Sequence, residues 1–444
     1  MASRGPGMDM ESGEAKTVVQ FVRPTVGGVR EHVIALAGGL TRDGYDVLVA
    51  GAIDAEMRRR LNSVRSRWAN IGFPETASSR ETSAAAARLS RLATSQHAAL
   101  VHAHDYHAGF IASRAMRHIK PRPAFICTAH SLPVSAARGF FGRLGERLRY
   151  RRLLATADKM IVTSNAIREA LSRLSRRAGG KCTTIYHGVD PAEYGIEVDP
   201  GVMKQVLGLN PAAVVIAIVG PLVPETSVDL FLRAAASLSA VVPNVDYLIV
   251  GRGPDRRQLE EEAHELRLTG NTIFAGHRDD IPAVLAVVDI VVIPSLTEGS
   301  SLVALEALAM GVSVVAADVG GLQEILADAP EAHLVASNDP DAIVRQLKVI
   351  LSQLPPEEDE TRPSEYISID GGRPVRTLVS ERAYELVEAD DWLRRRDHED
   401  LYNVRPGLRY VAEHFSLQSM LAATEATYEE VTRARSIASG EARQ

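Results

Sequence analysis

Cysteine is almost absent from this 444-residue chain, which holds only Cys127 and Cys182. Two cysteines cannot form a disulfide framework, so we expect a reduced, cytoplasmic setting. Long apolar runs are also missing: each falls short of the roughly 20 residues that span a bilayer, which argues against a transmembrane helix. Residues 1–16 carry acids and no apolar core. They predict a disordered N-terminal tail and no secretory signal.

A strong excess of charge is absent as well. The net charge of −6 gives no global attraction to nucleic acid or to anionic lipid. Hydrolase signatures are also missing, since the chain has no Gly-x-Ser-x-Gly elbow and no Ser-His-Asp order. Apolar residues at 45% and charged residues at 24% match globular averages, which excludes collagen-like and wholly disordered classes.

What the chain does contain is a regular alternation of short apolar runs and helical segments. Five runs in the first half favour buried strands: TVVQFV, YDVLVAG, AALVHAH, PAFICTAHS and KMIVTSN. Five more follow in the second half: AAVVIAIVG, VDYLIVG, NTIFAG, DIVVIPS and VSVVAAD. Such alternation indicates parallel sheets covered on both faces. We therefore expect one α/β domain over 17–190, a second over 211–353, and a turn-rich linker over 191–210.

The pattern changes after the second domain. Residues 354–405 open with an acidic, proline-bearing run and form an insert with weak patterning. Within this insert we expect a charged helix and a small hairpin around Asp370-Gly371-Gly372. Residues 406–444 predict a C-terminal helical segment that ends in a helix from Leu417 to Ala434.

Two loops that follow strands are candidate anion sites, because ligands of open α/β sheets bind beyond the carboxyl ends of the strands. Gly27 and Gly28 open a helix, and paired glycines let an anion approach the free N–H groups there. The second loop holds Glu298 and then Gly299-Ser300-Ser301, and its helix carries Glu306. The competing interpretation of Gly27-Gly28 is an ordinary glycine turn. For Glu298 and Glu306 the competing interpretation is a capping acid plus a solvent-facing glutamate.

Histidines gather at two other strand ends. His102, His104 and His107 lie in VHAHDYHAG, and His130 lies in TAHS. These histidines have no cysteine partners nearby in the sequence, and they lie at a strand end and not along a helix, so we expect no metal site. Substrate contacts or general acid–base chemistry suit histidines at strand ends. For at least two of them, a hydrogen-bonded, half-buried histidine is the alternative.

Taken together, these motifs resemble the retaining GT-B glycosyltransferases of the family that includes sucrose synthases and bacterial group 1 transferases. The likeness is densest over 214–325, where the family's E-x7-E element stands as Glu298 and Glu306. GGVREHV, LVHAHDYHAG, TAHS and YHGVD extend it through the first half. The resemblance implies two Rossmann-like, doubly wound domains facing a central cleft, with a C-terminal helix that crosses back to the N-terminal domain.

The resemblance also implies a role for each matched residue in the donor site. Glu306 is expected to bind the ribose of a nucleotide-diphosphate sugar. Glu298 and the amides of Gly299–Ser301 are expected to contact the transferred sugar. The N-terminus of the helix at Leu302 and the Gly27-Gly28 loop are expected to share the diphosphate.

On the acceptor side, the resemblance places His130 near the anomeric centre, and we expect His104 to be a further substrate contact. Transfer in such enzymes retains the anomeric configuration and needs no metal or other cofactor, because helix dipoles and basic side chains neutralise the leaving diphosphate. The expected acceptor is a glycan, a lipid-linked sugar or a small molecule. Donor base, sugar and acceptor are not identified by the sequence.

One loop departs from the family pattern. The loop GPLVPETS has Pro221 where the family has an arginine and Thr226 where it has a lysine. Those two cations normally pair with the leaving diphosphate. Arg252 is the first candidate to replace them and Arg30 a weaker one, although Arg252 could equally be an exposed loop residue. The departure raises an alternative function, a catalytically degenerate GT-B protein that serves as a binding or regulatory subunit in glycan assembly.

A basic stretch over 138–154 raises the question of membrane contact. It holds six arginines and one glutamate, with apolar residues between them. Such a stretch can lie on anionic headgroups, which would make the protein peripheral at the inner face of the membrane. We favour the other interpretation, a surface helix with a packed apolar face.

Overall fold

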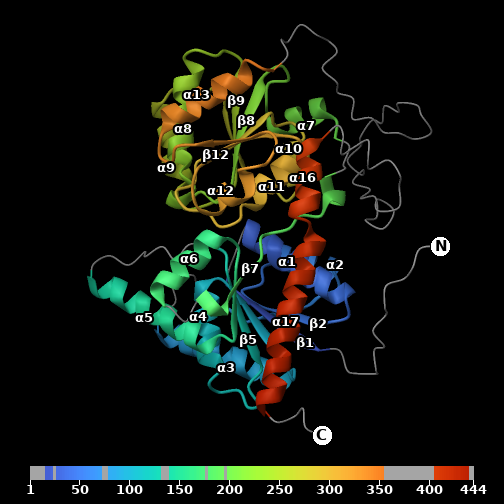
Figure 1. Ribbon diagram of the computed structural model, residues 1–444. Helices are drawn as coiled ribbons and strands as arrows, with labels where there is room; N and C mark the ends of the chain where they lie inside the picture. Colours follow the sequence, from blue (N-terminus) through green and yellow to red (C-terminus); the bar gives the residue numbers. More distant parts are fainter. Residues whose placement is uncertain are drawn as a thin grey trace, which may run out of the picture.

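The computed structural model describes residues 16–23, 27–72, 79–131, 140–175, 179–194, 198–354 and 405–439. They form two α/β domains stacked end to end, and the last helices run along both (Figure 1). The predicted insert, with its helix and hairpin, lies outside these residues except for its two ends, as does almost all of the N-terminal tail.

A seven-stranded parallel sheet forms the N-terminal domain, in the order β3-β2-β1-β4-β5-β6-β7. Its strands are β1 (Thr17–Val22), β2 (Asp46–Gly51), β3 (Arg67–Asn70), β4 (Leu100–His104), β5 (Ala124–Ala129), β6 (Lys159–Val162) and β7 (Cys182–Thr184). Its helices are α1 (Gly28–Arg42), α2 (Ala55–Ser63), α3 (Ser79–Ser95), α4 (Tyr106–Ala115), α5 (Phe140–Thr156) and α6 (Asn165–Leu174). All five predicted strands are present. β3 and β7 were missed because three or four residues at a sheet edge carry no apolar run.

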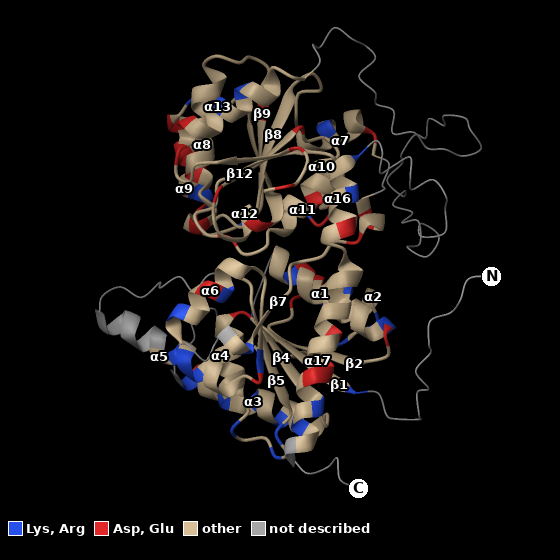
Figure 2. Ribbon diagram, in the orientation of Figure 1, with Lys and Arg blue, Asp and Glu red and all other residues tan. Residues whose placement is uncertain are grey.

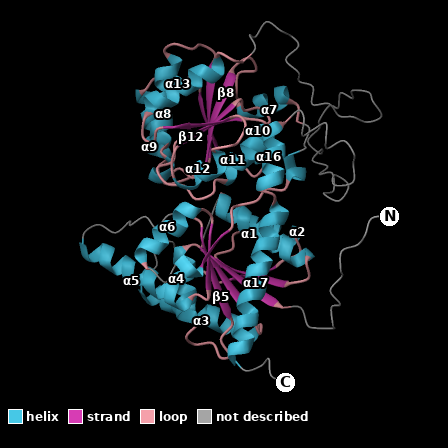
Figure 3. Ribbon diagram, in the orientation of Figure 1, coloured by secondary structure: helices cyan, strands magenta, loops and turns pink. Residues whose placement is uncertain are grey.

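The C-terminal domain repeats this plan with six parallel strands in the order β10-β9-β8-β11-β12-β13. Its strands are β8 (Val214–Val219), β9 (Val245–Val250), β10 (Thr272–Gly276), β11 (Ile290–Ile293), β12 (Ser313–Ala317) and β13 (Ala332–Val335). Its helices are α8 (Val228–Ser239), α9 (Arg256–Glu265), α10 (Ile281–Leu285), α11 (Leu302–Ala309), α12 (Gly320–Leu326) and α13 (Pro340–Leu351). Both sheets have helices on their two faces (Figure 3), so the predicted doubly wound fold class is confirmed.

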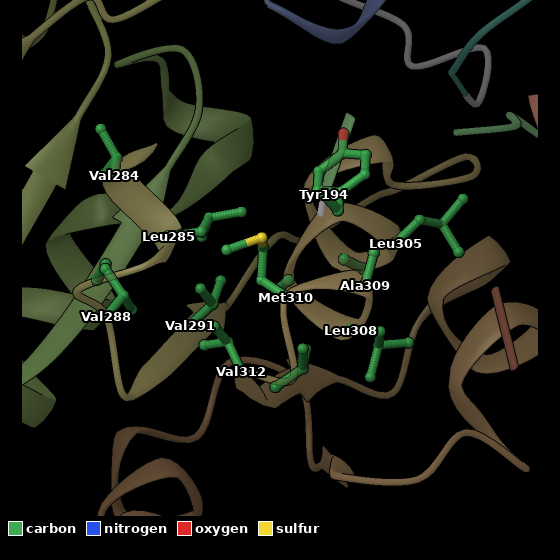
Figure 4. Close-up of a cluster of buried hydrophobic side chains, with 14 of the residues drawn as sticks. Tyr194, Val284, Leu285, Val288, Val291, Leu305, Leu308, Ala309, Met310 and Val312 are labelled. Atoms are coloured by element: carbon green, nitrogen blue, oxygen red, sulfur yellow. The ribbon is translucent and has the colours of Figure 1, made fainter. Parts of the chain in front are cut away.

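The segment predicted as a turn-rich linker has more structure than expected. It holds a 3-10 turn over Pro191–Tyr194 and the helix α7 (Pro200–Leu207). Asp199 begins this helix by accepting hydrogen bonds from the amides of Gly201 and Val202. Tyr194 packs with α11 in the core of the C-terminal domain (Figure 4). α7 was not predicted, because a helix of eight residues is too short to show a clear helical period.

Two further helices complete the fold, α16 (Pro406–His414) and α17 (Leu417–Ser439). α16 packs against α11 of the C-terminal domain, whereas α17 runs along the N-terminal domain (Figure 1). There Glu430 pairs with Lys159 at 2.7 Å, and the buried Tyr428 hydroxyl lies 2.6 Å from Nδ1 of His102. The crossing C-terminal helix of the predicted fold is therefore confirmed.

Helix α5 covers most of the basic stretch, and basic residues gather along its described half (Figure 2). Leu153 and Leu154 on this helix are buried in the core of the N-terminal domain, as in an ordinary surface helix. Among the described residues, no helix has both the length and the apolar character that crossing a membrane requires.

Candidate active site

The N-termini of two helices from different domains meet at the domain junction. α1 begins after Gly27, whose φ of 65° suits glycine, and α11 begins after Ser301. A Cβ atom placed on Gly28 would lie 3.7 Å from Cβ of Leu302, the first residue of α11. The positive ends of two helix dipoles therefore face each other across the junction, as an anion site between the domains requires.

The loop before α11, which holds Gly299–Ser301, packs closely against the N-terminal domain. The Ser301 hydroxyl caps the helix by accepting a hydrogen bond from the Ala304 amide at 3.4 Å, and the Ser300 hydroxyl accepts one from the His187 amide at 3.2 Å. A Cβ atom on Gly299 would approach the carbonyl oxygen of His130 to 2.3 Å, so only glycine fits there. The loop therefore joins the candidate sugar-binding residues of one domain to the histidines of the other.

Five buried histidines, His32, His102, His104, His130 and His187, form a cluster at this junction, which we call the histidine cluster. His104 Nδ1 lies 3.3 Å from His130 Nε2, and His130 Nδ1 lies 3.1 Å from His187 Nε2. His102 is set apart because its two ring nitrogens have hydroxyl groups as partners, those of Tyr428 and Thr128, and not other histidines. Burial lowers the pKa of each of the five rings, to about 3 for His102 and about 4 for His187. The cluster is therefore neutral at pH 7.

Sequence reasoning nominated His104 and His130, and the structure brings them together. It missed two members of the cluster, His32 on α1 and His187 after β7. His32 lies one helical turn after Gly28, so the two residues share a face near the start of the helix. This spacing could have indicated from the sequence that His32 lies near the Gly27-Gly28 loop. His187 stands in the YHGVD stretch without any local pattern that marks a binding residue.

Of the two glutamates of the E-x7-E element, Glu306 is buried and Glu298 is half-buried. Burial and the nearby Glu31 carboxylate raise the pKa of Glu306 to about 8, although a hydrogen bond from the Tyr194 hydroxyl at 3.2 Å opposes the rise. Burial also raises the pKa of Glu298 to about 7, against a hydrogen bond from Ser295. A buried carboxylate needs hydroxyl or cationic partners, so both glutamates are suited to accept hydrogen bonds from a sugar.

The loop with Pro221 and Thr226 lies directly against the loop that carries Arg252. The Leu222 amide donates a hydrogen bond to the Arg252 carbonyl oxygen at 3.1 Å. A Cβ atom on Gly253 would lie 2.1 Å from the Leu222 carbonyl oxygen, so the two loops approach as closely as glycine allows. The backbone of Arg252 is therefore held beside Leu222, the residue that follows Pro221.

The Arg252 side chain reaches across the junction to the N-terminal domain. Its Nη2 atom lies 3.6 Å from Oε2 of Glu56, and its side chain is 49% exposed. The same carboxylate oxygen is 2.8 Å from Nη1 of the buried Arg30, and His277 Nε2 lies 3.5 Å from the other oxygen. Basic groups from both domains thus converge on a single carboxylate, Glu56, which sequence reasoning did not single out.

A second contact holds the domains together at the N-terminus of α6. Glu324 on α12 accepts hydrogen bonds from the amides of Asn165 and Ala166, both at 2.7 Å. It also accepts one from the Tyr186 hydroxyl at 2.8 Å. A carboxylate from one domain therefore caps a helix of the other, which stabilises the contact between them.

Comparison with known proteins agrees with this architecture. The model of the family "Glycosyl transferases group 1" matches residues 202–367, and that of "Glycosyltransferase Family 4" matches residues 26–193. Together the models and the fold support a group 1 glycosyltransferase of GT-B architecture. An uncharacterized glycosyltransferase of Methanocaldococcus jannaschii is 26% identical over 338 residues, which cover 74% of this chain and 86% of that protein.

A D-inositol 3-phosphate glycosyltransferase of Mycolicibacterium gilvum is 36% identical over 194 residues, and this alignment spans 42% of each chain. Solved structures extend the likeness to the whole fold. The Anabaena protein HepE, solved with UDP and glucose, has a TM-score of 0.71 at 17% identity and covers 94% of this chain and all of that one. Sucrose-phosphate synthase from Thermosynechococcus elongatus has a TM-score of 0.70 at 18% identity, with the same coverage. At such identities the structural likeness shows the fold alone.

Proposed function

We propose that this glycosyltransferase moves a sugar from a nucleotide-diphosphate donor to a glycan, a lipid-linked sugar or a small molecule, with retention of configuration. The observation that carries the proposal is the meeting of α1 and α11 at the junction, where Gly28 faces Leu302. A diphosphate at that point interacts with both helix dipoles and lies between the histidine cluster and Glu306. The Anabaena protein HepE, solved with UDP and glucose, supports this class of donor.

In this proposal the nucleotide binds on the C-terminal side of the junction. Glu306 accepts hydrogen bonds from the two ribose hydroxyls, because a carboxylate can accept from both at once. Tyr194 already donates to one oxygen of this carboxyl group and orients it. The amides at the start of α11, which Ser301 leaves accessible, are donors for the diphosphate.

The transferred sugar then lies between the loop before α11 and the histidine cluster. Glu298 and the amides of Gly299–Ser301 approach it from one side, and His104 and His130 from the other. Neutral imidazoles can donate and accept, so they suit sugar hydroxyls as well as the acceptor hydroxyl whose proton is lost during transfer.

The negative charge that develops on the leaving diphosphate must be stabilised by positive charge from this chain. The two helix N-termini each contribute about half a positive charge. Arg252 supplies a full charge beside Pro221, and in the free protein Glu56 holds it. We infer that the incoming diphosphate replaces Glu56 as the partner of Arg252, and that Arg30 stays bound to Glu56 and Asp54. The transfer step itself then needs no metal and no further cofactor.

The alternative, a degenerate binding subunit, is not favoured. Its main argument is that Pro221 and Thr226 carry no charge, and the position of Arg252 beside Pro221 weakens that argument. The test is calorimetric titration with UDP, GDP and ADP and with their sugars, followed by an assay for nucleoside diphosphate release. We expect at least one nucleotide to bind with one-to-one stoichiometry and its sugar to be consumed. Binding without turnover for every donor would instead support the degenerate subunit.

A further inference from the structure

Three residues of the histidine cluster converge from three different elements. His32 comes from α1, His104 from the end of β4 and His130 from the loop after β5. One ring nitrogen from each lies within 4.8 Å of the other two. All three side chains are buried, with at most 7% of their surface exposed. Because the three rings meet at one edge of the sheet, their nitrogen atoms form a candidate set of metal ligands.

Hydrogen bonding leaves part of this set unsatisfied. A neutral imidazole has one donor and one acceptor nitrogen, so the row His104–His130–His187 forms two internal bonds and leaves its ends open. The end atoms, His104 Nε2 and His187 Nδ1, are buried without a partner in the structure, and so is Nδ1 of His32. Buried polar atoms without partners are costly, and they indicate that something else binds here.

The spacing matches a metal centre of the zinc class. Two nitrogen ligands of a tetrahedral zinc ion, with bonds of about 2.0–2.1 Å, lie about 3.3–3.4 Å apart. His104 Nδ1 and His130 Nε2 are 3.3 Å apart, so a cation bound to both would replace the hydrogen bond between them, and Nδ1 of His32 is the atom of the set that has no partner to give up. The other nitrogen of His130 bonds to His187 at 3.1 Å, which is the kind of partner that orients a metal-binding imidazole.

We propose that His32, His104 and His130 bind a divalent transition-metal cation of the zinc class, and that the bound cation blocks sugar transfer. Imidazole nitrogen is a preferred donor for zinc, copper and nickel, whereas magnesium prefers oxygen. The first half stands on the donor geometry alone. The second half rests on the proposed function, because the cation occupies the atoms that face the transferred sugar. The site is therefore inhibitory, and catalysis proceeds without metal.

The test of the first half is calorimetric titration of the full chain with Zn²⁺, together with the visible absorption of Co²⁺. We expect saturable one-to-one binding and a tetrahedral cobalt spectrum. His32→Gln and His130→Gln should each weaken zinc binding at least tenfold, with folding checked by thermal melting. His118→Gln, which removes an exposed imidazole outside the cluster, is the matched control and should bind zinc like the wild type.

A second group, Glu56, His277 and Asp279, also brings three donor atoms within 4.8 Å of one another, so it is the competing location. Loss of zinc binding in His277→Gln, with binding kept in His32→Gln, would overturn the proposal. So would a wild-type chain that shows no saturable zinc binding, a result that does not depend on how the variants fold.

The second half is tested with whichever donor the chain consumes. We expect Zn²⁺ to inhibit transfer in the wild type, EDTA to restore it, and the inhibition to be competitive with the donor sugar. Zinc binding at the cluster without inhibition would overturn this half. A chain that turns over no donor would refute the proposed function instead, and the titrations would still decide whether the metal site exists.

Discussion

Glu306 is a buried carboxyl group whose ionisation should change when a nucleotide binds. With a pKa of about 8, its carboxyl group is mostly protonated at pH 7 in the free protein. Ribose hydroxyls that donate to the carboxylate favour the charged form and lower this pKa. Nucleotide binding at pH 7 should therefore release a proton, and affinity should rise as the pH increases from about 6 to 8.

Glu306→Gln should weaken nucleotide binding about tenfold or more and abolish most of this proton release, since an amide cannot ionise. Calorimetry in buffers of different ionisation enthalpy measures both quantities. Glu261→Gln changes an exposed carboxylate on α9 and is the matched control. If Glu306→Gln binds the nucleotide as tightly as the wild type, the ribose does not bind at this residue.

Arg252 is the second residue whose proposed role can be tested by a single substitution. If it supports the leaving diphosphate, Arg252→Ala should lower kcat/KM at least about tenfold, a loss of roughly 1.4 kcal/mol of transition-state stabilisation. Arg257→Ala, on the exposed face of α9, is the control and should leave the rate unchanged. Full activity in Arg252→Ala would mean that the leaving diphosphate is stabilised by Arg30 or by a residue outside the described ranges.

The loop over 221–226 allows the reverse experiment. Pro221→Arg with Thr226→Lys introduces the two residues that the resemblance implies and adds two cations to the loop packed against that of Arg252, so nucleoside diphosphate binding should become tighter by about tenfold. The gain should shrink as salt is added, because it is electrostatic. Weaker binding in the double variant would mean that this loop does not face the diphosphate.

At the scale of elements, the contact between α12 and α6 is the interdomain bond with the clearest consequence. Glu324→Ala removes a carboxylate that accepts hydrogen bonds from two amides and one hydroxyl. Hydrogen bonds to a charged group contribute about 1.5–3 kcal/mol each, so the closed arrangement should lose roughly tenfold or more in population. Small-angle scattering should show a larger radius of gyration. Gln323→Ala, the exposed neighbour on α12, should leave the profile unchanged.

Elements with long apolar runs could be predicted from the sequence, and short ones could not. Runs such as VVIAIV in β8 carry their own signal because parallel strands are buried on both faces. β13 and α7 depend on tertiary packing for their existence, which local pattern does not show. The same limit applies to the site. Gly28 and Ser301 are marked by helix-start chemistry, and the spacing from Gly28 marks His32, whereas His187 and Glu56 become site residues only when distant elements meet.

The whole molecule is organised around the junction of its two sheets. α17 binds the N-terminal domain through Tyr428 and Glu430, while α16 packs on the C-terminal domain, so the last 35 described residues, 405–439, span both. A Cβ atom on Gly28 would lie only 3.7 Å from Cβ of Leu302, so the starts of the two helices are close together and we expect the domains to separate when a donor enters. We expect the interdomain contacts of Glu324 and Glu56 to control this separation.

The central claim, retaining transfer from a nucleotide sugar, is tested most directly by proton NMR of the purified chain with UDP-, GDP- and ADP-sugars. The anomeric proton of the sugar and the released nucleoside diphosphate are followed in one experiment, with water or an added glycan as the acceptor. We predict that one donor is consumed and that the first-formed product keeps the donor's anomeric configuration. A first-formed product of inverted configuration, or no consumption of any donor, would contradict it.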